Sequence, residues 1–179
     1  LTEMADVIFS YDGTVDKFIG DAVMAFWNAP LSQEDHARRG CWAALDQLKR
    51  LDELRPQWLA RGYPEMNARM GLHTGEVVVG NMGSRTYKNY TVIGDTVNLG
   101  ARLEPANKPF GTRIMISETT YEIAKEFIEA RRLDALQVKG KTKATFVFEL
   151  MAKKAELTPD RQQMLRLVVP SYKSKGRTR

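Results

Sequence analysis

Segments that favour strands and segments that favour helices alternate along this chain, and their order limits the possible folds more than any other feature. Residues 1–9 place apolar side chains at a helical period and precede a break at residues 12–13. Residues 14–27 consist of two stretches rich in Val, Ile and Phe on either side of Gly20-Asp21. Two such stretches around a Gly-Asp pair predict a β-hairpin.

The middle of the chain adds a long helix and a second hairpin. Apolar residues recur at helical spacing from residue 37 to residue 51. This spacing predicts an amphipathic helix that Pro56 should end or kink. Residues 67–80 favour a strand pair or one bent strand. The polar residues 81–90 lie between two runs of residues that favour strands, so we expect a long hairpin arm there.

The last third of the chain completes an α+β pattern. We expect a helix over residues 96–103 with Asp95 as its N-cap, then a strand at 113–116 and a helix at 117–127. Two closing strands should be joined at residues 139–141. This order predicts a mixed, largely antiparallel sheet with helices packed on one side, which is compatible with a ferredoxin-like core.

The charges divide the chain into two parts. A net charge of +5 suggests nucleic-acid binding until the charges are located along the sequence. Residues 1–152 are close to neutral, and residues 153–179 hold the positive excess. We therefore predict one domain over residues 1–152, a basic extension over residues 153–179 that is flexible at its end, and no nucleic-acid partner.

The composition also predicts where the domain works. No apolar run approaches the roughly 20 residues that a membrane-spanning helix needs. Cys41 is the only cysteine, so neither an internal disulfide nor a cysteine-based zinc site can form. These two observations predict a soluble domain in a reducing compartment, the cytoplasm.

Five polar residues occupy positions suited to chemistry. Asp21, at the hairpin turn, can bind a hard divalent cation, although aspartate also favours such turns for its backbone preferences. Lys17 lies in an apolar strand, where a lysine can also discourage edge pairing. Asn98 and Arg102 are spaced i, i+4 on a helix and can converge on one oxyanion, or form a solvated surface pair. Lys139 lies in a basic loop that can fold over phosphates.

Four segments together resemble the catalytic domains of the class III adenylate and guanylate cyclases, and they occur in the order of that family. They are VDKFIGDAVMAFWNAP at 15–30, GLHTGEVVVGNMG at 71–83, YTVIGDTVNLGARLE at 90–104 and VKGK at 138–141. The resemblance implies the class III cyclase fold. It also implies the conversion of ATP to 3′,5′-cyclic AMP and pyrophosphate.

The resemblance assigns a role to four of the polar residues. Asp21 resembles the second of two metal-binding aspartates, which implies two Mg²⁺ or Mn²⁺ ions in each site. Asn98 and Arg102 resemble the pair that orients the ribose and stabilises the transition state. Lys139 resembles the lysine that contacts the polyphosphate.

The same resemblance implies how the base is read and how the site is assembled. Lys17 and Thr91 match the two positions that read the purine, and a lysine with a threonine resembles adenine selection. A lysine donor suits the ring-nitrogen acceptor of adenine, whereas guanine carries a proton there. In the family two domains pair head to tail, so we expect a homodimer with sites at its interface and allow for an upstream regulatory or membrane domain.

One family feature is missing from the sequence. The first metal-binding aspartate of the family lies on an upstream strand with a motif like F-x-D-I, and no such motif is found here. We therefore expect a domain that lacks its first strand and has little activity by itself. The alternative hypothesis is a catalytically silent domain that binds a nucleotide or a partner.

Overall fold

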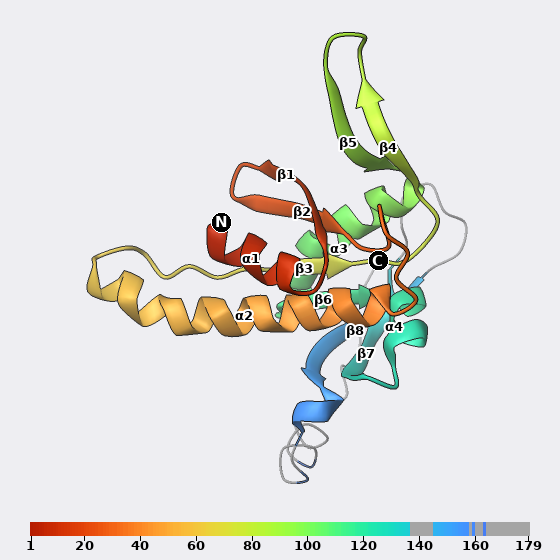
Figure 1. The fold of residues 1–179 in the computed structure, drawn as a ribbon. Helices are drawn as coiled ribbons and strands as arrows, with labels where there is room; N and C mark the ends of the chain where they lie inside the picture. Colours follow the sequence, from red (N-terminus) through yellow and green to blue (C-terminus); the bar gives the residue numbers. More distant parts are fainter. Residues whose placement is uncertain (137–144, 158, 160–162, 164–179) are drawn as a thin grey trace, which may run out of the picture.

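The structure, a computed structural model, describes residues 1–136, 145–157, 159 and 163. Its strands form one four-stranded mixed sheet and two separate hairpins (Figure 1). In spatial order, the strands of the central sheet are β3 (Met70–Leu72), β6 (Ile114–Ser117), β8 (Thr145–Lys153) and β7 (Ile128–Leu136). β3 runs parallel to β6, and the other neighbours are antiparallel. The predicted mixed α+β architecture is confirmed.

Two helices pack on one face of the central sheet. They are the long helix α2 (His36–Ala60) and the short helix α4 (Glu118–Ala124). Ile114 and Ile116 of β6 point to this face and join Cys41 of α2 in one buried cluster. Burial there raises the pKa of the Cys41 thiol to about 12.

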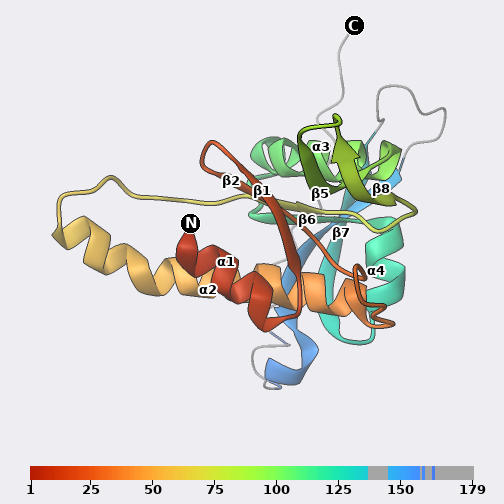
Figure 2. The same ribbon diagram turned by 45° about the horizontal axis from the view of Figure 1, so that its top comes forward.

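A third helix, α3 (Asp95–Phe110), covers the opposite face (Figure 2). Leu99 and Leu103 of α3 form a second buried cluster with Met115, the β6 residue that points away from α2. The prediction of helices on one side is therefore correct for α2 and α4 and wrong for α3. Because all four residues of β6 are buried and its first three are apolar, this strand needs cover on both faces.

Two helices are longer than expected and contain prolines. α2 continues beyond Pro56 to Ala60, and α3 includes Pro105 and Pro109 before it ends at Gly111 in a left-handed conformation. Packing of α3 against β3 and β6 therefore outweighs the helix-breaking tendency of proline. The N-cap of α3 is Gly94, and the expected cap, Asp95, is its first helical residue.

Both predicted hairpins form. β1 (Thr14–Ile19) and β2 (Ala22–Phe26) pair around a turn at residues 20–21, where Gly20 has a φ of 63°. β4 (Val78–Gly83) and β5 (Lys88–Ile93) pair as an arm that projects from the body (Figure 1).

The remaining expectations concern the first helix, residues 67–80 and the parts of the chain that the structure does not describe. The first helix, α1 (Thr2–Ser10), packs along α2. Residues 67–80 hold β3 and the start of β4 rather than a single pair. The predicted join at 139–141 lies outside the described residues, and the upstream strand stays a prediction. Among the described helices, none has the length and apolar character needed to cross a membrane.

Gly71 of β3 lies against the backbone of α3. A Cβ at this position would lie 2.5 Å from the backbone nitrogen of Glu104 and 2.7 Å from the Cβ of Leu103. Gly71→Ala should therefore lower the free energy of unfolding by about 2–3 kcal/mol, measured by urea denaturation. Gly100→Ala on α3, where the added Cβ meets only the Cβ of His73 at 3.8 Å, should not lower the free energy of unfolding. Equal stability of the two variants would contradict this packing.

Lys153, the last residue of β8, contacts three polar side chains from different parts of the chain. Its side chain is 8% exposed, and its Nζ lies 2.6 Å from Asp46 Oδ1, 3.0 Å from the Tyr11 hydroxyl and 3.2 Å from Glu156 Oε1. Burial by itself lowers the pKa of Lys153, but hydrogen bonds to these three groups outweigh burial and raise it. Lys153 thus links the end of β8 to α2 and to the residue that follows α1.

We expect Lys153→Met to lower the free energy of unfolding by about 2 kcal/mol, because Asp46 and Glu156 lose their ion pairs with Lys153. Since the pKa of Lys153 is higher in the folded chain, the stabilisation is complete below the ordinary lysine pKa and declines as the pH rises above about 10. Unfolding of both proteins between pH 7 and pH 11 tests this, with the exposed Lys49→Met as control. A difference between parent and variant that does not shrink at high pH would refute it.

Candidate functional site

The structure brings Lys17 and Thr91 together, although they are 74 residues apart in sequence. Lys17 lies on β1, and Thr91 lies on β5 where the arm leaves the body. The Nζ of Lys17 donates to the Oγ1 of Thr91 across 3.4 Å. The lysine side chain is 44% exposed, whereas Thr91 is 8% exposed. A partly exposed cation and a recessed hydroxyl therefore form one small polar site.

Asp16 completes this site and was missed by the sequence-based prediction. Its carboxylate oxygen Oδ2 accepts a hydrogen bond from Thr91 Oγ1, and Oδ1 lies 3.2 Å from the Nζ of Lys17. The register of β1 against β2 shifts between Val15 and Lys17, so Asp16 is the extra residue of a β-bulge. A bulge can direct two neighbouring side chains to one side of a strand. The signal in the sequence was an acidic residue beside Lys17 in an otherwise apolar strand.

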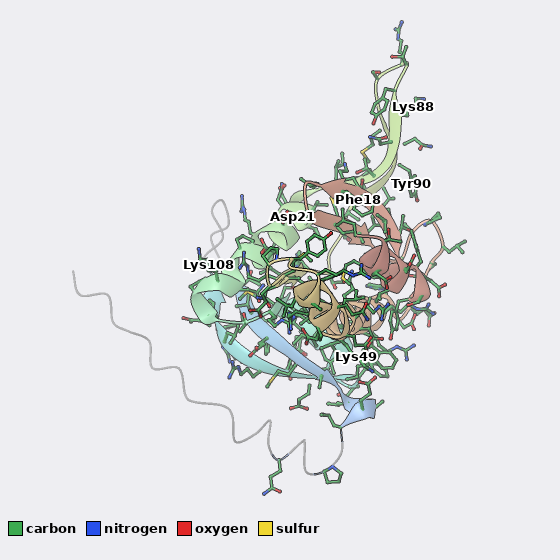
Figure 3. The ribbon with its side chains drawn as sticks, turned by 90° about the vertical axis from the view of Figure 1, so that its left-hand side faces the viewer. Phe18, Asp21, Lys49, Lys88, Tyr90 and Lys108 are labelled. Carbon is green, nitrogen blue, oxygen red and sulfur yellow. The ribbon has the colours of Figure 1, made fainter. Side chains whose placement is uncertain are left out.

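Asp21 lies at the free end of the β1–β2 hairpin, as predicted, and is exposed (Figure 3). A carboxylate held at a short turn is the kind of oxygen ligand that Mg²⁺ or Mn²⁺ prefers, so the residue fits a metal-binding role. Within the described ranges, no group of three or more His, Cys, Asp or Glu side chains can hold a metal ion.

Asn98 and Arg102 lie one turn apart on α3, and both are exposed. Side chains at this spacing lie on the same side of a helix, so an amide and a guanidinium can approach one anionic group. The helix starts directly after β5, which places it next in the chain to the strand of Thr91. Lys139, the fifth polar residue singled out in the sequence, lies outside the described residues.

The two strands that carry the polar site, β1 and β5, also carry exposed apolar side chains. Phe18 and Ile19 on β1 are 50% and 59% exposed, and Ile93 on β5 is 54% exposed. Figure 3 shows Phe18 and Tyr90 where the hairpin meets the arm, and the Tyr90 ring lies 6.1 Å from the Phe26 ring between centroids. Apolar groups that gather beside a polar site favour contact with another protein surface.

This arrangement can recognise a flat heterocycle and an anion. Lys17 supplies a donor, and the hydroxyl of Thr91 supplies a second polar group. Arg102 supplies a permanent positive charge with several donors on the neighbouring helix. A nucleotide carries both of the groups that such a surface binds.

Known proteins resemble this chain in sequence and in fold. The family model described as the adenylate and guanylate cyclase catalytic domain matches residues 2–150. Adenylate cyclase 1 of Rhizobium meliloti is 37% identical over 147 residues, which cover 82% of this chain and 22% of that protein. The chain thus spans less than a quarter of that relative.

Two solved structures superpose on the chain with a TM-score of 0.79 each. The adenylyl cyclase CyaB from P. aeruginosa is 34% identical, and the match covers 88% of this chain and 81% of that one. The guanylyl cyclase Cya2 is 33% identical, and the match covers 88% of this chain and 79% of that one.

Proposed function

Because this chain belongs to the adenylate and guanylate cyclase catalytic domain family, we propose that it converts ATP to 3′,5′-cyclic AMP and pyrophosphate. Similarity alone does not select the base, since one structural neighbour is named an adenylyl cyclase and the other a guanylyl cyclase. The contact between Lys17 and Thr91 carries the choice of ATP. The N1 of adenine is an acceptor, so the Lys17 ammonium can donate to it. The 6-amino group beside N1 is a donor, and a hydroxyl oxygen can accept a hydrogen bond from it.

In the proposed reaction the ribose 3′-oxygen attacks the α-phosphorus. The bond from that phosphorus to the bridging oxygen of the β-phosphate breaks, pyrophosphate leaves and the 3′-hydroxyl loses its proton. Arg102 stabilises the charge that develops on the α-phosphate, and Asn98 holds the ribose in line for attack. Asp21 would hold Mg²⁺ or Mn²⁺, which supplies Lewis-acid stabilisation of the phosphate oxygens when bound. Lys139 would contact the polyphosphate.

The proposed site is shared between two copies of the chain in a head-to-tail homodimer. The exposed side chains of Phe18, Ile19 and Ile93 offer an apolar surface for the second copy. Asp21 of one copy would then act with Lys17, Thr91, Asn98, Arg102 and Lys139 of the other. This division accounts for a metal-binding carboxylate that lies on a different element from the phosphate-binding pair.

The product identifies the function. The full-length protein, incubated with ATP or GTP and with Mg²⁺ or Mn²⁺, should release cyclic AMP from ATP with the higher kcat/KM, as detected by mass spectrometry. Cyclic GMP as the main product would overturn the choice of base. Binding of ATP without release of either cyclic nucleotide would favour the catalytically silent domain instead.

A further inference from the structure

The Asp16 carboxylate is buried and has no part in the reaction proposed above. Its side chain is 0% exposed, although it lies on a strand whose neighbouring residues 17–19 are exposed. A carboxylate that loses its water must gain other polar partners. Among the described residues, its contacts are the Thr91 hydroxyl and the Lys17 ammonium. Both partners are the residues that read the base in the proposed function.

The hydrogen bond to Asp16 fixes the direction of the Thr91 hydroxyl. A hydroxyl has one proton to donate, and an ionised carboxylate can only accept. The proton of Thr91 is therefore committed to Oδ2 of Asp16, and the remaining capacity of Oγ1 is to accept. Lys17 uses part of that capacity at 3.4 Å, a long contact that an incoming donor can replace.

We propose that Asp16 is a positioning residue that makes the site selective for 6-aminopurines by holding the Thr91 hydroxyl as an acceptor. Lys17 then offers a donor and Thr91 an acceptor, which matches the N1 and the 6-amino group of adenine. A 6-oxopurine presents the reverse pattern, an N1–H donor and an oxygen acceptor. This inference rests on the proposed function, because it explains how the same site reads its base.

The carboxylate also holds Lys17 in place. Oδ1 of Asp16 has no hydrogen-bond partner among the described residues and makes an ion pair with Nζ at 3.2 Å. Loss of the negative charge on Asp16 would thus remove the interaction that holds Lys17 and the one that orients Thr91. The Thr91 hydroxyl would become free to rotate and donate to a 6-oxo group, and the lysine would lose its nearby countercharge.

Inosine triphosphate provides the sharpest comparison, since its base has the 6-oxo and N1–H pattern of guanine without the 2-amino group. In the full-length protein, Asp16→Asn keeps the size of the side chain but removes its charge. We expect the ratio of kcat/KM for ATP to kcat/KM for ITP to fall about tenfold or more. Asp6→Asn, an exposed position on α1, is the matched control and should leave the ratio unchanged.

A second variant separates positioning from a general structural effect. Thr91→Val removes the hydroxyl, so Asp16→Asn should change the ratio by less than about twofold in that background if Asp16 acts through the hydroxyl. Both constants come from one preparation, so their ratio does not depend on the fraction of folded protein. An unchanged ratio in Asp16→Asn, or an equal fall with and without Thr91→Val, would overturn the inference.

Lys17→Ala distinguishes failure of this inference from failure of the proposed function. A lower ratio in Lys17→Ala together with an unchanged ratio in Asp16→Asn would overturn the role of Asp16 alone. An unchanged ratio in Lys17→Ala would overturn base reading by this site, and the inference with it. If the protein turns over neither nucleotide, the same ratios are taken from Kd values for ATP and ITP by calorimetry, with the same criteria.

Discussion

Asn98→Ala and Arg102→Ala are each expected to lower kcat for cyclic AMP formation by at least about 100-fold, as measured in the full-length protein. In the proposed reaction Arg102 would offer a fixed charge to the α-phosphate in the transition state, where negative charge moves toward the leaving group. Asn98 would hold the ribose so that its 3′-oxygen is in line with the bond that breaks. Both contacts are stronger in the transition state than in the ground state, so kcat should fall more than KM rises.

A matched control lies on the same helix. Lys108 is an exposed cation in the last turn of α3, and Lys108→Ala should change kcat by less than about twofold. The proposal that α3 carries the catalytic pair would be refuted if Asn98→Ala and Arg102→Ala kept nearly the kcat of the parent.

The double substitution of Lys17→Glu with Thr91→Cys should lower kcat/KM for ATP by about 100-fold or more, because an acceptor would then face N1 of adenine. Any rise in kcat/KM for GTP should be smaller than this fall in kcat/KM for ATP. The buried Asp16 carboxylate lies beside position 17, so it would repel a second carboxylate there, and the new side chain would not keep the position of the Lys17 ammonium. Steady-state kinetics with both nucleotides give the two constants.

A charge reversal far from the proposed site is the control for the double variant at positions 17 and 91. Lys49→Glu places the same change on an exposed part of α2 and should leave the preference for ATP over GTP intact. If the double variant at 17 and 91 also kept the parent's preference, the contact between these residues would have no part in reading the purine.

Local patterns predicted the hairpins correctly because their signals are short in range. Gly20 supplies the positive φ that a tight turn needs, and strand-forming residues flank it directly. The bulge at Asp16 depends instead on pairing between β1 and β2 and on a contact with β5, 75 residues away. No local pattern reports such a contact, so Asp16 could be noticed in the sequence but not placed in the site.

The ends of α3 and its position show a second limit of sequence-based prediction. The helix was expected over residues 96–103, but it continues to Phe110. Asn107 is fully buried and its side-chain amide donates to Met70 O of β3 at 2.9 Å, which anchors the last turns. Apolar residues on both sides of β6 decided that α3 covers a second face. The described residues form no group of three or more candidate metal ligands, so the two-metal site stays a prediction.

Mixing two inactive variants of the full-length protein tests the shared adenylate cyclase site most directly. In the proposed homodimer, Asp21→Ala would remove a metal ligand from both sites, and Asn98→Ala would remove transition-state support from both. A heterodimer combines both lesions in one site and leaves the other site intact, so activity should return to at most about half that of the parent dimer. Native mass spectrometry counts the heterodimers. Return of cyclic AMP formation in proportion to their number is the predicted result, whereas heterodimers that form and stay inactive would contradict the shared site.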